Sequence, residues 1–163
     1  MLKFQELSEH NPVHVSLLQG LLEAAPGYSL TVEGRLPAPT DGIEAFRDLP
    51  AGKERKDKLI GIYLYQDTPI GCVDLVRAYP EPHIAFLGLL LFAEAHQGHG
   101  HGVEAIRHIK EMSRAWSCTA VRLAVIETNV SAFRFWKREG FSELYRKPRT
   151  QYTGAAIVME TAL

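Results

Sequence analysis

A glycine-rich turn between an apolar run and a helical pattern is the feature that most restricts the fold of this chain. The turn reads Gln-Gly-His-Gly-His-Gly over residues 97–102. The apolar run Ile84–Phe92 precedes it, and a helix-like segment that starts at Val103 follows it. Backbone N–H groups at the start of a helix attract anions, and glycine lets a phosphate come close because it has no Cβ. The pattern predicts a strand, a phosphate-binding turn and a helix in succession.

The spacing of the glycines distinguishes this turn from two common phosphate-binding motifs. A P-loop continues with Lys and then Ser or Thr, whereas Val-Glu follows Gly102. A dinucleotide fingerprint reads Gly-x-Gly-x-x-Gly, whereas this turn reads Gly-x-Gly-x-Gly. The pattern that fits is Gln/Arg-x-x-Gly-x-Gly. It resembles the loop with which the GNAT superfamily of N-acetyltransferases binds the pyrophosphate of acetyl-CoA. The alternative is a glycine-rich turn without a ligand.

A second motif resembles the same superfamily. Residues Val121–Ile126 alternate and are rich in β-branched side chains, which predicts a strand. After it comes Asn129-x-x-Ala-x-x-Phe-Trp136-x-x-x-Gly-Phe. Relatives carry Asn-x-x-Ala-x-x-Leu/Phe-Tyr-x-x-x-Gly-Phe at this place. The resemblance is good over about residues 57–147 and loose over the first fifty residues.

The resemblance implies that acetyl-CoA is the cosubstrate and that its pantetheine arm lies beside the strand Ile84–Phe92. A backbone N–H of that strand would polarise the thioester carbonyl. The plainer reading of the run is a core strand, and the two readings are compatible. The residues implied for coenzyme binding are Leu90, Leu91, Phe92, Gln97, Gly98, His99, Gly100, His101, Gly102, Val103, Asn129 and Trp136.

Acetyl transfer also needs a neutral amine, and relatives often place a Glu or His on the fourth strand to remove its proton. An alkylamine with a pKa of about 10.4 is almost fully protonated at pH 7. The equivalent positions here are Phe86 and Gly88, so that base is absent. The two substitute candidates for the catalytic base are Glu127, just after a predicted strand, and Asp74, inside an apolar strand. The alternatives are a solvated loop acid for Glu127 and a paired structural carboxylate for Asp74.

Trp136 stands where many relatives carry a tyrosine that protonates the leaving thiolate. An indole N–H donates a hydrogen bond but does not release its proton near neutral pH. A thiolate whose thiol has a pKa of about 8.5 can leave without a strong acid, by analogy with cysteine. Tyr145 or water could supply the proton instead. The exchange of tyrosine for tryptophan weakens the implied mechanism of thiolate protonation more than it weakens the implied binding of acetyl-CoA.

Two segments are expected to shape the acceptor pocket, again from the resemblance. They are Ala25–Pro39, which contains Tyr28, and Arg77–Pro82, which contains Tyr79. Tyr28 and Tyr79 are therefore the candidate substrate-binding residues, and ordinary loop packing is the alternative for each. The expected acceptor is a primary amine, on a small molecule ahead of a peptide.

Composition is that of one globular domain over residues 1–163, with 46% hydrophobic and 23% charged residues. The net charge of −1 favours neither a nucleic acid nor an anionic membrane as partner. No apolar run reaches the roughly 18 residues of a membrane span, and the start lacks a signal-peptide pattern. Cys72 and Cys118 are isolated, which suits a reducing cytoplasm. Four histidines gather between His96 and His108, but a metal site needs converging ligands and none is expected.

The periodicity predicts an α/β fold in which helices cover a mixed sheet, similar to the GNAT topology. Residues 25–40 are expected to be irregular, because Pro26-Gly27 stop the first helix and two later prolines limit another. Helices are expected at Asn11–Ala24, Thr40–Leu49, about Gly100–Trp116 and about 131–139. Strands are expected at Leu2–Leu7, Leu59–Gln66, Pro69–Ala78, Ile84–Phe92, Val121–Ile126, Phe141–Lys147 and Ala155–Thr161.

Together the motifs predict a cytoplasmic, acetyl-CoA-dependent N-acetyltransferase that moves the acetyl group directly to a primary amine. A homodimer is compatible with this prediction. The alternative is a non-catalytic module that binds or senses acyl-CoA. The missing base on the fourth strand and the tryptophan in place of tyrosine motivate that alternative.

Overall fold

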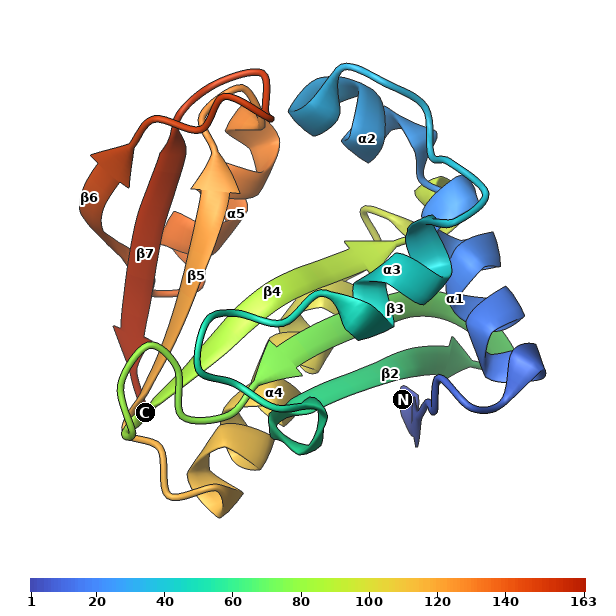
Figure 1. Cartoon of the computed structure of the whole chain (residues 1–163), viewed down its shortest axis with the longest axis horizontal. Coiled ribbons are helices and arrows are strands. Elements are labelled where there is room, and N and C mark those ends of the chain that lie inside the picture. Colours follow the sequence, from blue (N-terminus) through green and yellow to red (C-terminus); the bar gives the residue numbers. More distant parts are fainter.

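A seven-stranded mixed sheet forms the centre of the molecule (Figure 1). The computed structural model describes all of residues 1–163. The strand order is β1-β2-β3-β4-β5-β7-β6, and only β4 and β5 pair in parallel. The strands are β1 (Lys3–Glu6), β2 (Lys58–Tyr65), β3 (Thr68–Val76), β4 (Ile84–Phe92), β5 (Ala120–Ile126), β6 (Ser142–Lys147) and β7 (Ala156–Ala162).

Five α-helices cover the two faces of this sheet (Figure 1). On one face, α4 and α5 bury Ile109 and Trp136 in the larger core cluster. On the other face, α1 and α3 bury Leu18 and Phe46 in a second cluster. None of the helices has the length and apolar character needed to cross a lipid bilayer. The helices are α1 (Pro12–Glu23), α2 (Pro26–Glu33), α3 (Asp41–Arg47), α4 (His101–Ala115) and α5 (Val130–Arg138), and two 3₁₀ turns lie at Arg55–Asp57 and Glu94–His96.

The alternation of side chains along β3 shows why both faces of the sheet must be covered by helices. Val73 and Leu75 point into the cluster under α4, whereas Cys72 points into the cluster under α1. Successive residues of a strand face opposite sides of the sheet, so an apolar run such as this one is buried on both. The predicted α/β fold with a mixed sheet flanked by helices is confirmed.

The pairing between β4 and β5 is short, and this shapes the site. The register covers only Ile84–Leu87 against Ala120–Leu123. Beyond this stretch β4 continues to Phe92 beside β3 alone, and β5 continues beside β7 alone. The two strands diverge there and leave a wedge in the middle of the sheet (Figure 1).

The prediction that residues 25–40 are irregular was wrong for their first part. Pro26 does not end a helix but occupies the first turn of α2, where its missing N–H costs nothing. The helix ends at Gly34, which is left-handed with a φ of 72°. The two later prolines, at positions 37 and 39, lie beyond that end. A helix of eight residues therefore fits between the two proline signals.

Candidate active site

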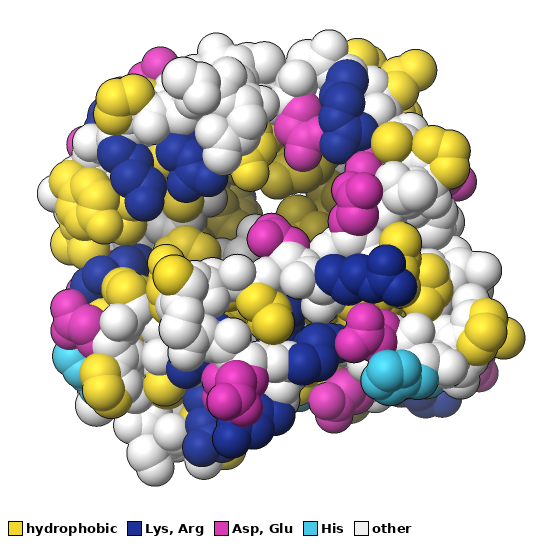
Figure 2. Space-filling model, viewed as in Figure 1, with side chains coloured by type: hydrophobic (Ala, Val, Ile, Leu, Met, Phe, Trp, Pro, Cys, Tyr) yellow, Lys and Arg dark blue, Asp and Glu magenta, His cyan; other side chains and the backbone are white.

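A cavity of about 720 Å³ occupies the wedge between β4 and β5. Figure 2 shows it as a hollow between the β5–β7 side and the α2 side of the molecule, with hydrophobic side chains in its depth. Its walls come from β4, β5, α2, the glycine turn, the first residues of α4 and residues along the whole length of α5. Eleven of the twelve residues predicted for the coenzyme line this cavity; the exception is His99.

The glycine turn has the backbone geometry of an open anion site. Gly98 and Gly100 are left-handed, with φ values of 78° and 82°. At both positions a Cβ would find no atom within 4 Å, so the surface above the turn is free. Gly100 is the N-cap of α4 and leaves the first N–H groups of that helix without a side-chain cap. An anion can therefore approach these N–H groups directly.

The side chains of the turn support it rather than point into it. Gln97 Nε2 donates a hydrogen bond to the carbonyl of Phe92 over 2.8 Å, which ties the turn to the end of β4. The ring of His101 stacks on that of Phe92, with centroids 6.0 Å apart. Burial, and next the neighbouring His99 and His96, lower the pKa of His101.

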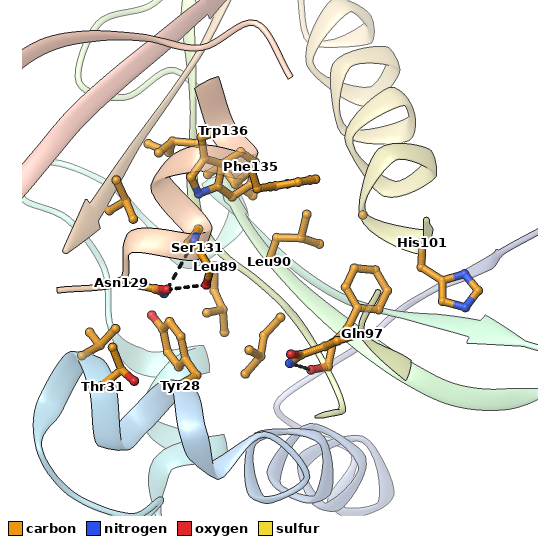
Figure 3. A pocket seen from close by; sticks show the side chains of 18 of the residues that line it. Tyr28, Thr31, Leu89, Leu90, Gln97, His101, Asn129, Ser131, Phe135 and Trp136 are labelled. Atoms are coloured by element: carbon orange, nitrogen blue, oxygen red, sulfur yellow. Dashed lines mark hydrogen bonds between the residues drawn. The ribbon is translucent and has the colours of Figure 1, made fainter. Parts of the chain in front are cut away.

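Helix α5 brings Asn129 and Trp136 to the opposite wall of the cavity (Figure 3). Asn129 is the N-cap of α5, and its Oδ1 accepts a hydrogen bond from Ala132 N over 3.4 Å. Trp136 is 8% exposed and packs edge-on against Phe135 and Phe141. Trp136 is thus a core residue and a lining residue at once, with its indole nitrogen turned toward the cavity (Figure 3).

Helix α2 closes the far side of the cavity and is held at both ends. At its start, Gly27 N donates a hydrogen bond to Glu94 Oε1 over 2.8 Å. At its end, Thr153 Oγ1 donates to the carbonyl of Thr31 over 2.6 Å. Tyr28 projects from this helix into the cavity, and burial raises the pKa of its phenol well above the usual value. Of the two predicted acceptor residues, Tyr28 thus lines the cavity.

Tyr79, the other predicted acceptor residue, does not line the cavity. Its ring meets that of Phe86 edge-on, with centroids 5.5 Å apart, in the turn between β3 and β4. No residue of the segment Arg77–Pro82 lines the cavity.

The two carboxylates predicted as bases also lie outside the lining, and both form ion pairs. Glu127 is largely exposed and stands 3.6 Å from Arg146. Asp74 is paired with the buried Lys58 over 2.9 Å. Burial raises the pKa of Asp74, although Lys58 opposes the effect. The Asp74 carboxyl carbon lies 3.3 Å from where a Cβ on Gly88 would stand, so it borders the cavity only through that glycine.

Several lining residues were not predicted from the sequence. Arg138, the last residue of α5, is the cation of this helix that lines the cavity, and its guanidinium lies over the ring of Phe135 at 5.6 Å. Phe135 and Arg138 are three residues apart on one helix face, a spacing from which this placement could have been inferred. Glu94, Thr31 and Ser131 come from elements whose meeting depends on the tertiary fold. No group of three or more His, Cys, Asp or Glu side chains is arranged to hold a metal ion.

This combination of sheet, turn and cavity defines an acyltransferase-like architecture, and comparison with known proteins agrees. A model of the acetyltransferase (GNAT) family matches residues 24–141, which is more than half of the chain. The chain therefore belongs to the GNAT acetyltransferase family. Comparison with curated proteins gave no match.

Solved structures share the fold at low sequence identity. An acetyltransferase from Thermus thermophilus has a TM-score of 0.79 at 21% identity, over 100% of this chain and 97% of that one. An aminoglycoside acetyltransferase, AAC(6')-Ib in complex with coenzyme A, has a TM-score of 0.75 at 18% identity, over 99% and 95% of the two chains. A GNAT acetyltransferase from Elizabethkingia anophelis with bound acetyl-CoA has a TM-score of 0.70 at 11% identity, over 99% and 98%.

Proposed function

We propose that this protein transfers the acetyl group of acetyl-CoA directly to a primary amine of a small molecule. The observation that carries the proposal is the open glycine turn at the head of α4, which leads into the cavity between β4 and β5. A coenzyme with a phosphate-rich end and a long, thin thioester arm matches both parts of this arrangement. The family membership of the chain supports the same reaction class.

The pyrophosphate would be held at the turn. The N–H groups around Gly98 and Gly100 and the positive end of α4 favour negative charge. Such a site contributes about 0.3–1 kcal/mol per charge at the surface, and up to about 2 when partly buried. Arg138 adds a positive charge to the same cavity.

The thioester would lie in the gap between the strands. Backbone groups of β4 beyond Leu87 have no partner on β5, so they are free to bond the amides of the pantetheine arm and polarise the thioester carbonyl. The nitrogen lone pair of the amine attacks the carbonyl carbon. The C–N bond forms, the C–S bond breaks, and its electron pair leaves on sulfur, while nitrogen gives up one proton to water and the thiolate takes one up from water. The Trp136 N–H would donate a hydrogen bond to the bound thioester but not a proton.

The acceptor would enter past Tyr28, on the side of the cavity away from the glycine turn. Tyr79 would touch only a part of the acceptor that extends beyond the lining. Asp74 and Glu127 remain the candidate bases from the sequence, and either would have to act through water. The ion pairs that engage both carboxylates argue for a structural role beside this one.

A non-catalytic acyl-CoA-binding module is the second candidate. The observation in its favour is that neither carboxylate predicted as a base lines the cavity. Binding would then persist without turnover.

The release of free thiol from acetyl-CoA in the presence of a panel of amines separates the two candidates. Wild-type protein should bind acetyl-CoA and release thiol with at least one amine. Binding without release for every amine would favour the module.

A matched pair of variants tests the site itself. Gly100→Val forces a β-branched residue into a left-handed conformation and covers the anion site, so binding measured by calorimetry should be lost. Gly52→Val introduces the same backbone strain, at a φ of 79° in an exposed loop, and should leave binding intact. Unchanged affinity in a folded Gly100→Val protein would show that the turn does not hold the coenzyme.

A further inference from the structure

The end of the cavity away from the glycine turn is formed by α2 together with Leu89 of β4 and Ile126 at the end of β5. We name it the acceptor end, and it is lined by Gly27, Tyr28, Thr31, Val32, Leu89 and Ile126. Figure 3 shows Tyr28 and Thr31 on one side of the cavity, and Gln97 and His101 of the glycine turn on the other. If the turn holds the coenzyme, the amine must approach from the acceptor end. What this end can bind therefore decides the class of acceptor.

The titratable groups that line the whole cavity are few. His96 and His101 belong to the glycine-turn side, and Arg138 is a cation on α5. Glu94 is the one carboxylate, and its Oε1 accepts the hydrogen bond from Gly27 at the start of α2. Tyr28 is the remaining group. Burial keeps its phenol protonated, with Tyr152, Glu33 and Cys72 adding to the effect.

An alkylammonium ion would be poorly held at this end. Its charge would leave water for a wall that is largely aliphatic and aromatic, with the Glu94 carboxylate beside Gly27 as the one lining acid, and a buried charge needs a partner to offset its lost hydration. The carboxylate of Glu94 already serves the N-terminus of α2. An alkylamine with a pKa of about 10.4 would also have to lose a proton before it could attack, and neither Asp74 nor Glu127 lines the cavity.

We propose that the acceptor is an aromatic amine, whose nitrogen is already neutral at pH 7. This inference rests on the proposed acetyl transfer and specifies its substrate. The lone pair of an aromatic amine is delocalised into the ring, so the molecule enters the cavity uncharged and needs no base before attack. The proton on nitrogen becomes acidic once the C–N bond has formed, and it leaves to water or to the departing thiolate. The acceptor's ring packs against the ring of Tyr28.

Paired amines of equal ring size test this directly. Para-substituted anilines and the corresponding cyclohexylamines have the same ring size and differ in basicity, and spermidine adds a flexible polycation. Release of thiol from acetyl-CoA is measured for each over a range of about pH 6.5 to 9. The anilines should show the higher kcat/KM at pH 7, because they enter the cavity uncharged, whereas only about one alkylamine molecule in a few thousand is neutral there. Their rate should be flat with pH, whereas that of the cyclohexylamines should rise about tenfold per unit.

Three results would overturn the inference. Preferred turnover of spermidine or of cyclohexylamines at pH 7 would overturn it and leave acetyl transfer standing. Binding of acetyl-CoA without thiol release for any amine would overturn the proposed function as well. Loss of an ionisation from the aniline pH profile in Glu94→Gln, which keeps an oxygen for the Gly27 N–H, would identify Glu94 as a base and overturn the inference too.

Tyr28 provides the matched variants. Tyr28→Leu removes the ring and should lower kcat/KM for anilines by about tenfold, with the KM for acetyl-CoA unchanged. Tyr28→Phe keeps the ring and should stay within about threefold of wild type. Equal losses of aniline and cyclohexylamine turnover in Tyr28→Leu would show that the ring does not select aromatic acceptors.

Discussion

Asn129 occupies the turn between β5 and α5, where its side chain already has a partner. Its Oδ1 caps α5 through Ala132 N, which leaves its amide N–H₂ for a ligand in the cavity. We expect Asn129→Ala to weaken acetyl-CoA binding by about 1–3 kcal/mol through the lost hydrogen bond. It should also lower stability by about 0.5–2 kcal/mol through the lost cap.

Asn129→Ser separates the two effects, because serine caps a helix but has no amide. Calorimetry should show the weaker binding in both variants, whereas thermal melting should show a lower Tm only for Asn129→Ala. The shape of the pH–rate curve should not change in either, since asparagine does not titrate. Wild-type affinity in Asn129→Ser would contradict a role in holding the pantetheine arm.

Trp136 combines packing with a place in the cavity wall, and these roles predict different outcomes. Trp136→Phe removes the N–H donor and should reduce turnover by about 1 kcal/mol, or five- to tenfold, with an unchanged pH–rate profile. Trp136→Ala should cost about 3–5 kcal/mol of stability, because it empties a buried site between Phe135 and Phe141. A loss of turnover beyond about a hundredfold in a stable Trp136→Phe protein exceeds one hydrogen bond and would assign proton transfer to this position.

His101 gives the glycine turn a pH dependence whose sign can be worked out. Burial first, and then His99 and His96, hold its pKa below the ordinary value, so the ring is neutral at pH 7. Coenzyme phosphates bound at the turn would raise that pKa, so binding takes up a proton at this ring. Affinity for acetyl-CoA should therefore rise as the pH falls through the range between two pKa values of His101. The upper limit is its pKa in the complex with the coenzyme, and the lower limit is its pKa in the free protein.

Calorimetry near pH 6.5, in two buffers of different ionisation enthalpy, measures this proton uptake. The coenzyme's own phosphate also titrates in this range, and His101→Asn provides the correction for it. We expect the variant to take up fewer protons than wild type. Equal uptake in both proteins would show that the phosphates lie too far from this ring to affect it.

Among the elements, α2 owes its position to contacts at its two ends. Thr153→Val keeps the side-chain shape but removes the bonds of Oγ1 to the carbonyls of Thr31 and Val32. We expect a loss of about 0.5–1.5 kcal/mol of stability, faster hydrogen exchange of the α2 amides, and a higher KM for the acceptor. Thr119→Val, in the exposed turn between α4 and β5, is the control. Unchanged exchange in α2 would mean that the remaining contacts, from Glu94, Thr128 and the Thr153 backbone N–H, are enough to hold the helix.

The elements that the sequence could predict are those with a strong local signal. β4, the glycine turn and α4 follow from an apolar run, glycine spacing and an amphipathic pattern, and all three form as expected. Helix α2 was missed because Pro26-Gly27 is a common helix stop. Its identity as a helix depends on Glu94 and Thr153, which are distant in the chain.

The same distinction applies to the site. The residues predicted for the coenzyme could be named because a motif fixes their spacing, and most of them line one cavity. The partners of Asp74 and Glu127 could not be found in this way. Lys58 reaches Asp74 across the register of β2 and β3, and Arg146 reaches Glu127 from another strand. A sequence shows that a buried acid needs a partner, but not which side chain the fold brings to it.

For the molecule as a whole, the cavity lies where the two parts of the sheet meet. The β1–β4 part and the β5–β7 part are connected in the sheet by the short parallel pairing of Ile84–Leu87 with Ala120–Leu123. A ligand that fills the wedge contacts both parts and should stabilise their junction. Acetyl-CoA at about 100 times its Kd should add about 2.7 kcal/mol to the free energy of unfolding. Thermal melting should show this gain in wild type and Gly52→Val but not in Gly100→Val.

The structure of the complex with acetyl-CoA tests the proposed site most directly. We expect the pyrophosphate within hydrogen-bonding distance of the backbone N–H groups of residues 98–103, and the pantetheine arm in the gap between β4 and β5. The acetyl group should lie between Trp136 and the acceptor end, open toward Tyr28. Acetyl-CoA bound elsewhere, or with its phosphates away from the glycine turn, would contradict the assignment of this cavity.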